Sequence, residues 1–163
     1  SSRASANGPS LLFRRDAYAP DAFWYGNRPY VAAEISGPEA AALIPRIEAT
    51  IARYPYASRG DYIVWPGPNS NSFVAWVVRN TDGFNVSLPP AAVGKDYLGG
   101  GFHIARSGSG TGFVMSFSGI AGVTLGWREG FELNLLGSSI GIDPDDLAIS
   151  LPALGKLSAL PRS

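Results

Sequence analysis

The chain has no cysteine, a single histidine and a single methionine among its 163 residues. Without cysteine it forms neither disulfides nor thiolate metal sites, and it offers no thiol nucleophile. One imidazole also leaves a histidine metal site short of ligands, so metal binding would depend on carboxylates alone. The sequence therefore predicts no metal site and no cofactor.

Charged residues are scarce, at 16% of the chain, and the 13 basic residues equal the 13 acidic ones. No basic surface for a phosphate backbone is expected, so we predict no nucleic-acid binding. Long apolar runs are missing too, because the longest, residues 113–127, is interrupted by glycine and serine and falls short of a membrane span. Hydrophobic residues nevertheless make up 45% of the chain, which is typical of a folded domain.

The composition divides the chain into a short lead-in and one domain. The first ten residues, SSRASANGPS, are small and polar and predict a flexible lead-in, whereas residues 11–163 predict a single domain. The chain begins with Ser1 rather than methionine. We therefore expect it to be a fragment or a processed product of a longer parent.

Two helical regions are predicted in the first half of the chain. Gly37-Pro38-Glu39 is typical of a helix start, because proline and an acidic residue both suit the first turn. Apolar residues follow at helical spacing, and Pro45 is expected to kink this helix or to begin another. A further helix is predicted after Pro66-Gly67-Pro68, where apolar residues recur at helical spacing from Phe73 onward.

The second half of the chain predicts a sheet. β-Branched and aromatic residues with repeated glycines indicate short antiparallel strands at residues 113–118, 120–127 and 131–136. The aspartates around Pro144 predict a turn and the start of a helix, because their spacing does not fit a calcium loop. The predicted fold class is α+β, with helices packed on a mostly antiparallel sheet.

Four small polar residues, Asn69-Ser70-Asn71-Ser72, stand between the proline-rich turn and the second helix. Serine and asparagine at such a position cap a helix by accepting hydrogen bonds from its first free N–H groups. Alternatively, Ser70 is held as a nucleophile at the positive end of the helix, where developing negative charge is stabilised. The third interpretation is ligand binding by these residues without chemistry.

The run PGPNSNSF, residues 66–73, and the segments WYGNRP, AVGKDY, SGTGF and EGFELNLLG resemble an uncharacterised bacterial family called domain of unknown function 3750. The similarity extends from about Pro20 to Leu157 and brings no known activity. Members of that family usually carry, upstream, a hydrophobic anchor and a histidine before a tryptophan, and neither is in this chain. The resemblance implies a parent protein of the bacterial cell envelope or periplasm, associated with the membrane through a segment that this chain lacks.

Residues 69–73, Asn-Ser-Asn-Ser-Phe, also resemble the Asn-Cys-Asn-Thr-Phe turn of permuted papain-like thiol hydrolases, the NlpC/P60 and deSUMOylase-like group. This resemblance implies a permuted papain-like (NlpC/P60-like) fold, with Ser70 in the position of the cysteine. A serine hydroxyl needs a general base within about 2.6–3.2 Å. His103 is more typical of a structural hydrogen-bonding residue than of a base, so we predict that this chain is not a competent hydrolase.

Other polar residues are weaker candidates. The turn GSGTG, residues 108–112, is predicted to be flexible rather than a phosphate loop, since no lysine and helix follow it. Glu129 and Glu132 could pair as acid and base, but a solvated turn or edge is the expected setting. Lys95-Asp96 could reach the region of Ser70. Three residues would suit a sugar or peptide ligand, with a buried aromatic anchor as the alternative: Trp24, Tyr25 and Arg28.

The function predicted is a non-catalytic binding or interaction module of the bacterial cell envelope. Asn69, Asn71 and Ser72, with nearby aromatic residues, would form its recognition edge for a protein partner, a peptide or a glycan. The first alternative is an amidase- or peptidase-type acyl hydrolase, with Ser70 as nucleophile and His103, or a histidine of a missing segment, as base. The second alternative is an accessory subunit of a membrane protein complex, which predicts a flat apolar patch on the folded domain.

Overall fold

The structure of the chain, a computed structural model, describes residues 31, 33–58, 60–89, 92–143, 148–151 and 155–158. The predicted lead-in, residues 1–10, lies outside these described residues. So do three of the predicted binding residues: Trp24, Tyr25 and Arg28.

Both predicted helices are present. Helix α1 spans Gly37–Ile51, with Pro38 and Glu39 in its first turn as expected, and it continues through Pro45 rather than ending there. Helix α2 spans Ser70–Asn80 and buries the side chains of Ala75, Val77 and Val78. Both helices therefore begin where the capping and proline signals of the sequence place them.

From Phe102 onward the described chain forms one seven-stranded antiparallel sheet, in which each strand pairs with the next along the chain. The three predicted strands are confirmed as β2, β3 and β4, with bounds that differ by no more than one residue. The strands are β1 Phe102–Arg106, β2 Gly112–Phe117, β3 Ala121–Gly126, β4 Gly130–Leu135, β5 Ser138–Asp143, β6 Ala148–Leu151 and β7 Gly155–Ser158.

Residues 144–147, where a helix was predicted to start, lie outside the described residues, and the described residues that follow them are strands rather than a helix. Residues 148–151 and 155–158 are strands β6 and β7, and Ile149 pairs with both Ile142 and Leu157. The free edge of β5 offers backbone hydrogen-bonding groups to the residues that follow it. Such tertiary pairing overrides a local signal as short as one proline with neighbouring aspartates.

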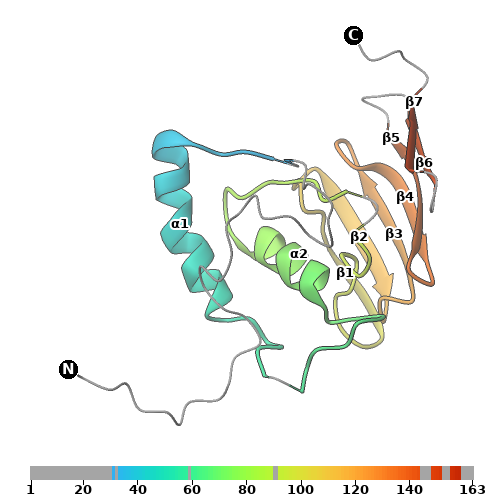
Figure 1. Ribbon diagram of the computed structural model, residues 1–163, viewed down its shortest axis with the longest axis horizontal. Coiled ribbons are helices and arrows are strands. Elements are labelled where there is room, and N and C mark those ends of the chain that lie inside the picture. The colour runs from blue at the N-terminus through green and yellow to red at the C-terminus, as the bar shows by residue number, and fades with distance from the viewer. Residues whose placement is uncertain are drawn as a thin grey trace, which may run out of the picture.

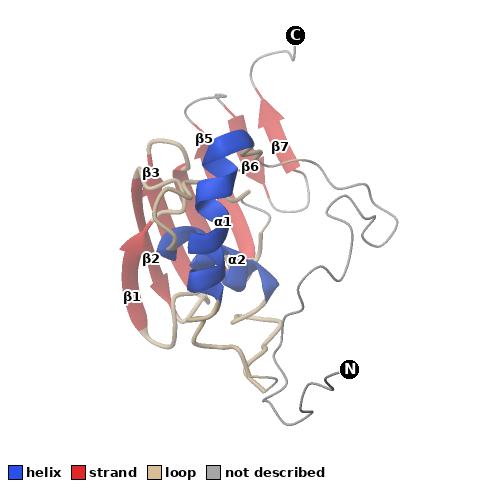
Figure 2. Ribbon diagram, turned by 90° about the vertical axis from the view of Figure 1, so that its left-hand side faces the viewer, coloured by secondary structure: helices blue, strands red, loops and turns tan. Residues whose placement is uncertain are grey.

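The two helices lie on the same side of the sheet, with α2 between α1 and the strands (Figure 1). The view turned by 90° also places both helices in front of one face of the sheet (Figure 2). The α+β fold class, with helices packed on an antiparallel sheet, is thereby confirmed. The permuted papain-like version of this fold stays a prediction.

The two faces of the sheet differ sharply in composition. The inner face, which α2 covers, is largely polar and buried, and it includes Ser116, Thr124, Glu132 and Asn134. We call the opposite side the outer face, and no described helix covers it (Figure 1). Its apolar residues are Phe102, Ile104, Phe113, Met115, Phe117, Ala121, Val123, Leu125, Phe131, Leu133, Leu135, Ile140 and Ile142.

Neither α1 nor α2, the helices of the described part of the chain, is long and apolar enough to cross a lipid bilayer. The outer face is an exposed apolar patch of the kind that the accessory-subunit alternative expects.

Candidate functional site

The four polar residues at the start of α2 form a capping box. The side-chain Oδ1 of Asn69 accepts a hydrogen bond from the backbone N–H of Ser72 at 3.0 Å, and the backbone N–H of Asn69 donates to Ser72 Oγ at 3.2 Å. Each residue thus satisfies a backbone donor that the first turn of a helix leaves free. The capping interpretation is confirmed for these two residues.

The same residues also attach the loop before β1 to α2. Ser72 Oγ donates to the carbonyl of Gly94 at 2.7 Å, and Asn71 Nδ2 donates to the carbonyl of Val93 at 2.9 Å. Asn69 Nδ2 donates to Val93 as well, at 3.2 Å. Asn69 and Ser72 are buried, so their polar groups act inside the chain, and their predicted role in ligand binding stays a prediction.

This attachment requires glycine where the two backbones meet. Gly94 has a φ of +87°, and a Cβ atom there would lie 2.6 Å from Asn69 Nδ2. Gly67 has a φ of +132°, and a Cβ atom would lie 2.9 Å from Ser72 Oγ. Any larger residue would have to adopt a strained conformation and displace the capping side chains.

Ser70, the first residue of α2, differs from its neighbours because its side chain is exposed. It stands at the edge of a cavity of about 130 Å³, which we call the aromatic pocket. The residues that line this pocket are Tyr54, Tyr56, Tyr62, Pro68, Asn69, Ser70 and Phe73.

Tyr54 lies at the centre of the packing around the aromatic pocket. Its ring contacts Phe73 and Trp76 edge to face, with centroid distances of 4.9 and 5.3 Å, and Tyr56 at 5.8 Å. Burial, with smaller contributions from Tyr56, Tyr97 and Asp61, raises the pKa of Tyr54 to about 12. The phenol is therefore protonated at neutral pH, and this wall of the pocket is uncharged.

His103 lies on β1 and is exposed. Its Nε2 is 2.8 Å from the carbonyl oxygen of Gly100, so that nitrogen donates a hydrogen bond and carries a proton. His103 does not line the aromatic pocket, and in the described part of the chain no hydrogen bond joins it to Ser70. The structure thus does not bring the two predicted catalytic residues into hydrogen-bonding contact.

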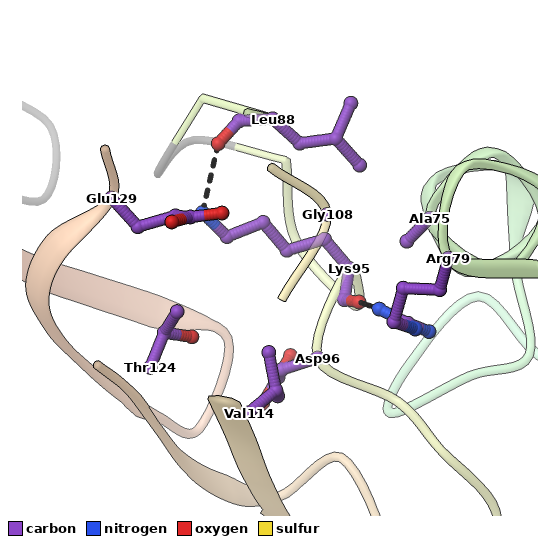
Figure 3. Close-up of a pocket in the computed structure, with 9 residues that line it drawn as sticks. All are labelled: Ala75, Arg79, Leu88, Lys95, Asp96, Gly108, Val114, Thr124 and Glu129. Carbon is purple, nitrogen blue, oxygen red and sulfur yellow. Dashed lines mark hydrogen bonds between the residues drawn. The ribbon is translucent and has the colours of Figure 1, made fainter. Parts of the chain in front are cut away.

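A second group of polar side chains lies between α2 and the inner face of the sheet (Figure 3). Lys95 Nζ donates to Glu132 Oε2 at 2.6 Å and to the carbonyl of Leu88 at 3.0 Å. Glu129 accepts hydrogen bonds from the backbone N–H and the hydroxyl of Ser109, at 2.9 and 2.7 Å. We call this group the buried charge cluster, and its members are Arg79, Lys95, Asp96, Glu129 and Glu132.

The predicted solvated setting of the two glutamates is wrong. Glu129 and Glu132 are only 8% and 3% exposed. Glu132 points to the inner face, where Lys95 neutralises it, and Glu129 turns back toward the loop at Ser109. A buried carboxylate needs such partners, because a buried ion without a partner lowers the free energy of unfolding by on the order of several kcal/mol.

Two atoms of the cluster have no hydrogen-bond partner among the described residues: Arg79 Nη2 and Asp96 Oδ2. The other end of the Arg79 fork, Nη1, donates to the carbonyl of Lys95 at 2.9 Å. The adjoining cavity encloses about 30 Å³. Since one water needs roughly 10–15 Å³, this space suits about two or three waters and no organic ligand.

The environment of the cluster raises the pKa of some of its groups and lowers the pKa of others. Burial raises the pKa of Asp96 and also that of Glu132, where it outweighs the attraction of Lys95. Burial lowers the pKa of Arg79 to about 10, against the opposing effect of Asp96. Burial would also raise the pKa of Glu129, but the hydrogen bonds from Ser109 outweigh it and lower that pKa.

The predicted contact of Lys95-Asp96 with the region of Ser70 is made by the two residues before them. The carbonyls of the preceding residues, Val93 and Gly94, contact the start of α2, whereas Lys95 and Asp96 point into the charge cluster.

In the described residues no group of three or more histidine, aspartate or glutamate side chains is arranged to hold a metal ion. Sequence reasoning also missed Tyr56 and Tyr62 as pocket residues, since their only signal was an aromatic run after α1.

Comparison with protein families identifies the chain. The model of the family described as Protein of unknown function (DUF3750) matches residues 7–97, more than half of the sequence. The chain therefore belongs to this family. The match includes the start of α2, the residues of the aromatic pocket and Lys95-Asp96, and it ends before β1. Neither the curated proteins nor the solved structures that were compared include a match to the chain.

Proposed function

We propose that this member of the DUF3750 family is a non-catalytic binding module whose aromatic pocket receives a ring-sized apolar group of a peptide ligand. The observation that carries the proposal is the pocket of about 130 Å³ beside the exposed Ser70. A cavity of about 150 Å³ in another protein holds one benzene molecule. The walls of three tyrosines, Phe73 and Pro68 suit such a group.

The start of α2 adds a polar contact at the edge of the pocket. The N–H groups of Ser70 and Asn71 have no hydrogen-bond partner among the described residues, and they stand at the positive end of the helix. These donors suit a carboxylate or a carbonyl oxygen, and the Ser70 hydroxyl can donate as well. The ligand we infer is therefore the end of a peptide with an aromatic last residue and a free carboxylate.

The probe for this proposal is N-acetylphenylalanine, titrated while the backbone amide signals of the chain are followed by NMR. We expect shifts at Ser70 and Asn71, with a dissociation constant on the order of 1 mM, because one ring and one carboxylate supply about 4 kcal/mol. The carboxamide of the probe lacks the charge and should bind about 2- to 5-fold more weakly, the size of a helix-terminus effect.

A pair of variants of α2 localises the binding. Ser70→Phe places a ring at the mouth of the pocket and should abolish the shifts. Val74→Phe adds the same ring at an exposed position of the same helix that does not line the pocket, and should leave them unchanged. Binding that survives Ser70→Phe would place the ligand elsewhere and would refute the proposed site.

The competing hydrolase function makes a different prediction for Ser70. An activated serine reacts covalently with a fluorophosphonate, whereas a hydroxyl without a general base does not. We expect no mass increase when the chain is incubated with this reagent. A mass increase that Ser70→Ala abolishes would contradict the non-catalytic assignment and favour the acyl hydrolase.

We also propose that the protein lies in the bacterial cell envelope, on the basis of the family resemblance in the sequence. Fractionation of cells that express the protein from its own gene tests this location. Recovery with the periplasmic or membrane fraction supports it, and recovery with cytoplasmic marker proteins contradicts it.

A further inference from the structure

The outer face of the sheet exposes a large apolar area. Its four phenylalanines are between 44% and 64% exposed, which at roughly 200 Å² per side chain amounts to about 450 Å². Six exposed leucines and isoleucines of β1 and β3–β5 raise the total to the order of 800 Å². A monomer typically exposes no more than about 300–600 Å² in one apolar patch.

The outer face also carries little charge. Strands β1–β4 contain two charged residues, and the register places one of them, Arg106, on this face, opposite Phe113 at the edge of the sheet. The other, Glu132, points to the inner face. An interface that attracts anionic lipid headgroups would need several basic side chains around its rim. The partner of this face must therefore be apolar and neutral as well.

The pattern of large and small side chains on the outer face suits packing against a similar sheet. Strand β3 carries the small residues Ala121 and Val123, which are half-buried, between the larger side chains of β2 and β4. Phe117 pairs with Ala121, which in turn pairs with Leu135 on the other neighbouring strand. Large and small side chains thus alternate across the face, as they do in the interlocking layers between two packed sheets.

We propose that the outer faces of two copies of this chain pack against each other about a two-fold axis and form a sheet-on-sheet dimer. Each copy would contribute on the order of 800 Å², which equals one side of a standard protein interface. A two-fold contact needs a self-complementary surface, and a neutral apolar face meets that condition. The proposal is independent of the aromatic pocket, because that pocket lies on the helix side of the molecule.

The molar mass of the chain in solution tests the proposal, measured by sedimentation equilibrium over a range of concentrations. We expect twice the 17.2 kDa chain mass at high concentration and the monomer mass on dilution. Leu133→Lys places a charge within the face and should raise the dissociation constant roughly 100-fold or more, since a two-fold contact carries the change twice. Ile44→Lys, at an exposed position of α1, is the matched control and should leave it unchanged.

Each other outcome overturns the proposal. A dimer that survives Leu133→Lys, in a variant whose circular dichroism shows it to be folded, uses a different surface. A chain that stays monomeric at every concentration has no such partner in solution. If that monomer cosediments with phosphatidylcholine vesicles, and Leu133→Lys abolishes the cosedimentation, the outer face binds lipid rather than a second copy.

Discussion

The inner and outer faces of the sheet are built from the same strands, in alternation, yet they carry opposite chemistry. Ser116 is 1% exposed, and its neighbour Phe117 is 56% exposed; Thr124 is 3% exposed, and its neighbour Leu125 is 47% exposed. A sheet with one solvated face normally turns its apolar residues inward and its polar residues toward water. This sheet does the reverse along β2, β3 and β4.

The reversal separates the residues that stabilise the fold from those that are available for contact with a partner. Polar groups under α2 are tolerated because the charge cluster pairs most of them, with Lys95 on Glu132 and Ser109 on Glu129. Apolar residues on the outer face gain nothing from water, so their exposure indicates a contact made outside the described chain. The inner face thus serves the fold, and the outer face serves association.

The largest effect should come from breaking the ion pair of the inner face. Lys95→Met or Glu132→Leu alone leaves one buried charge without its partner and should lower the free energy of unfolding by about 3–5 kcal/mol. The double variant removes both charges and should lie close to wild type. Urea unfolding followed by circular dichroism measures all three, and single variants that cost less than about 1 kcal/mol would show that the pair is solvated.

The second-largest loss in the free energy of unfolding should come from disturbing the close approach of Asp96 to strand β3. A Cβ atom at Gly122 would lie 2.5 Å from Asp96 Oδ2, so Gly122→Ala must displace that carboxyl group. The expected loss in the free energy of unfolding is about 1–3 kcal/mol. Gly100→Ala is the control, because a Cβ atom there has no neighbour within 4 Å. Equal effects of the two substitutions would contradict the close approach of Asp96.

Two carboxyl groups of the buried charge cluster should respond to pH in opposite directions. The raised pKa of Asp96 means that its contribution to the free energy of unfolding falls as pH rises above the ordinary value of 3.8. Asp96→Asn removes that fall, so the stability of the variant relative to wild type should increase with pH.

The lowered pKa of Glu129 has the opposite consequence. Its contribution to stability is present above the ordinary value of 4.5 and is lost as pH falls through the folded value. Glu129→Gln should therefore become more destabilising, relative to wild type, as pH rises. Urea unfolding at several values between about pH 3 and pH 7 checks both variants. Parallel pH profiles for the two would show that their environments do not differ as described.

The smallest effect should come from the outer face. In dilute monomer, Leu125→Thr should change the free energy of unfolding by no more than about 0.5 kcal/mol, because the side chain is exposed there. The same urea measurement tests it. A loss above about 1.5 kcal/mol would mean that this leucine is packed within the monomer, which would end the contrast between the two faces.

Much of the fold could be predicted from the sequence where local signals are strong. Pro38 with Glu39, and Asn69 with Ser72, identified the helix starts, and glycine-separated apolar runs identified β2–β4. The strands after Pro144 were missed, because their pairing with β5 is a tertiary contact that leaves no local pattern.

The site was harder to predict, for a physical reason. Glu132 lies close to other charged residues beside an apolar strand, so a solvated turn or edge was expected for it. Its burial depends on Lys95, which lies 37 residues away in the sequence. The Asn69–Ser72 cap could be predicted because its hydrogen bonds are local, whereas the aromatic pocket joins residues on either side of the proline turn.

The contrast between the two faces is tested most directly by the exposure of the outer face in solution, and Met115 reports on that exposure. This residue is the only methionine of the chain and lies on β2 with its side on the outer face, so a ¹³C-labelled methionine methyl gives one NMR signal from that surface. We predict that a soluble paramagnetic agent broadens the signal in dilute solution and no longer does so at concentrations where the dimer forms. A signal that stays equally broadened at every concentration would contradict the account.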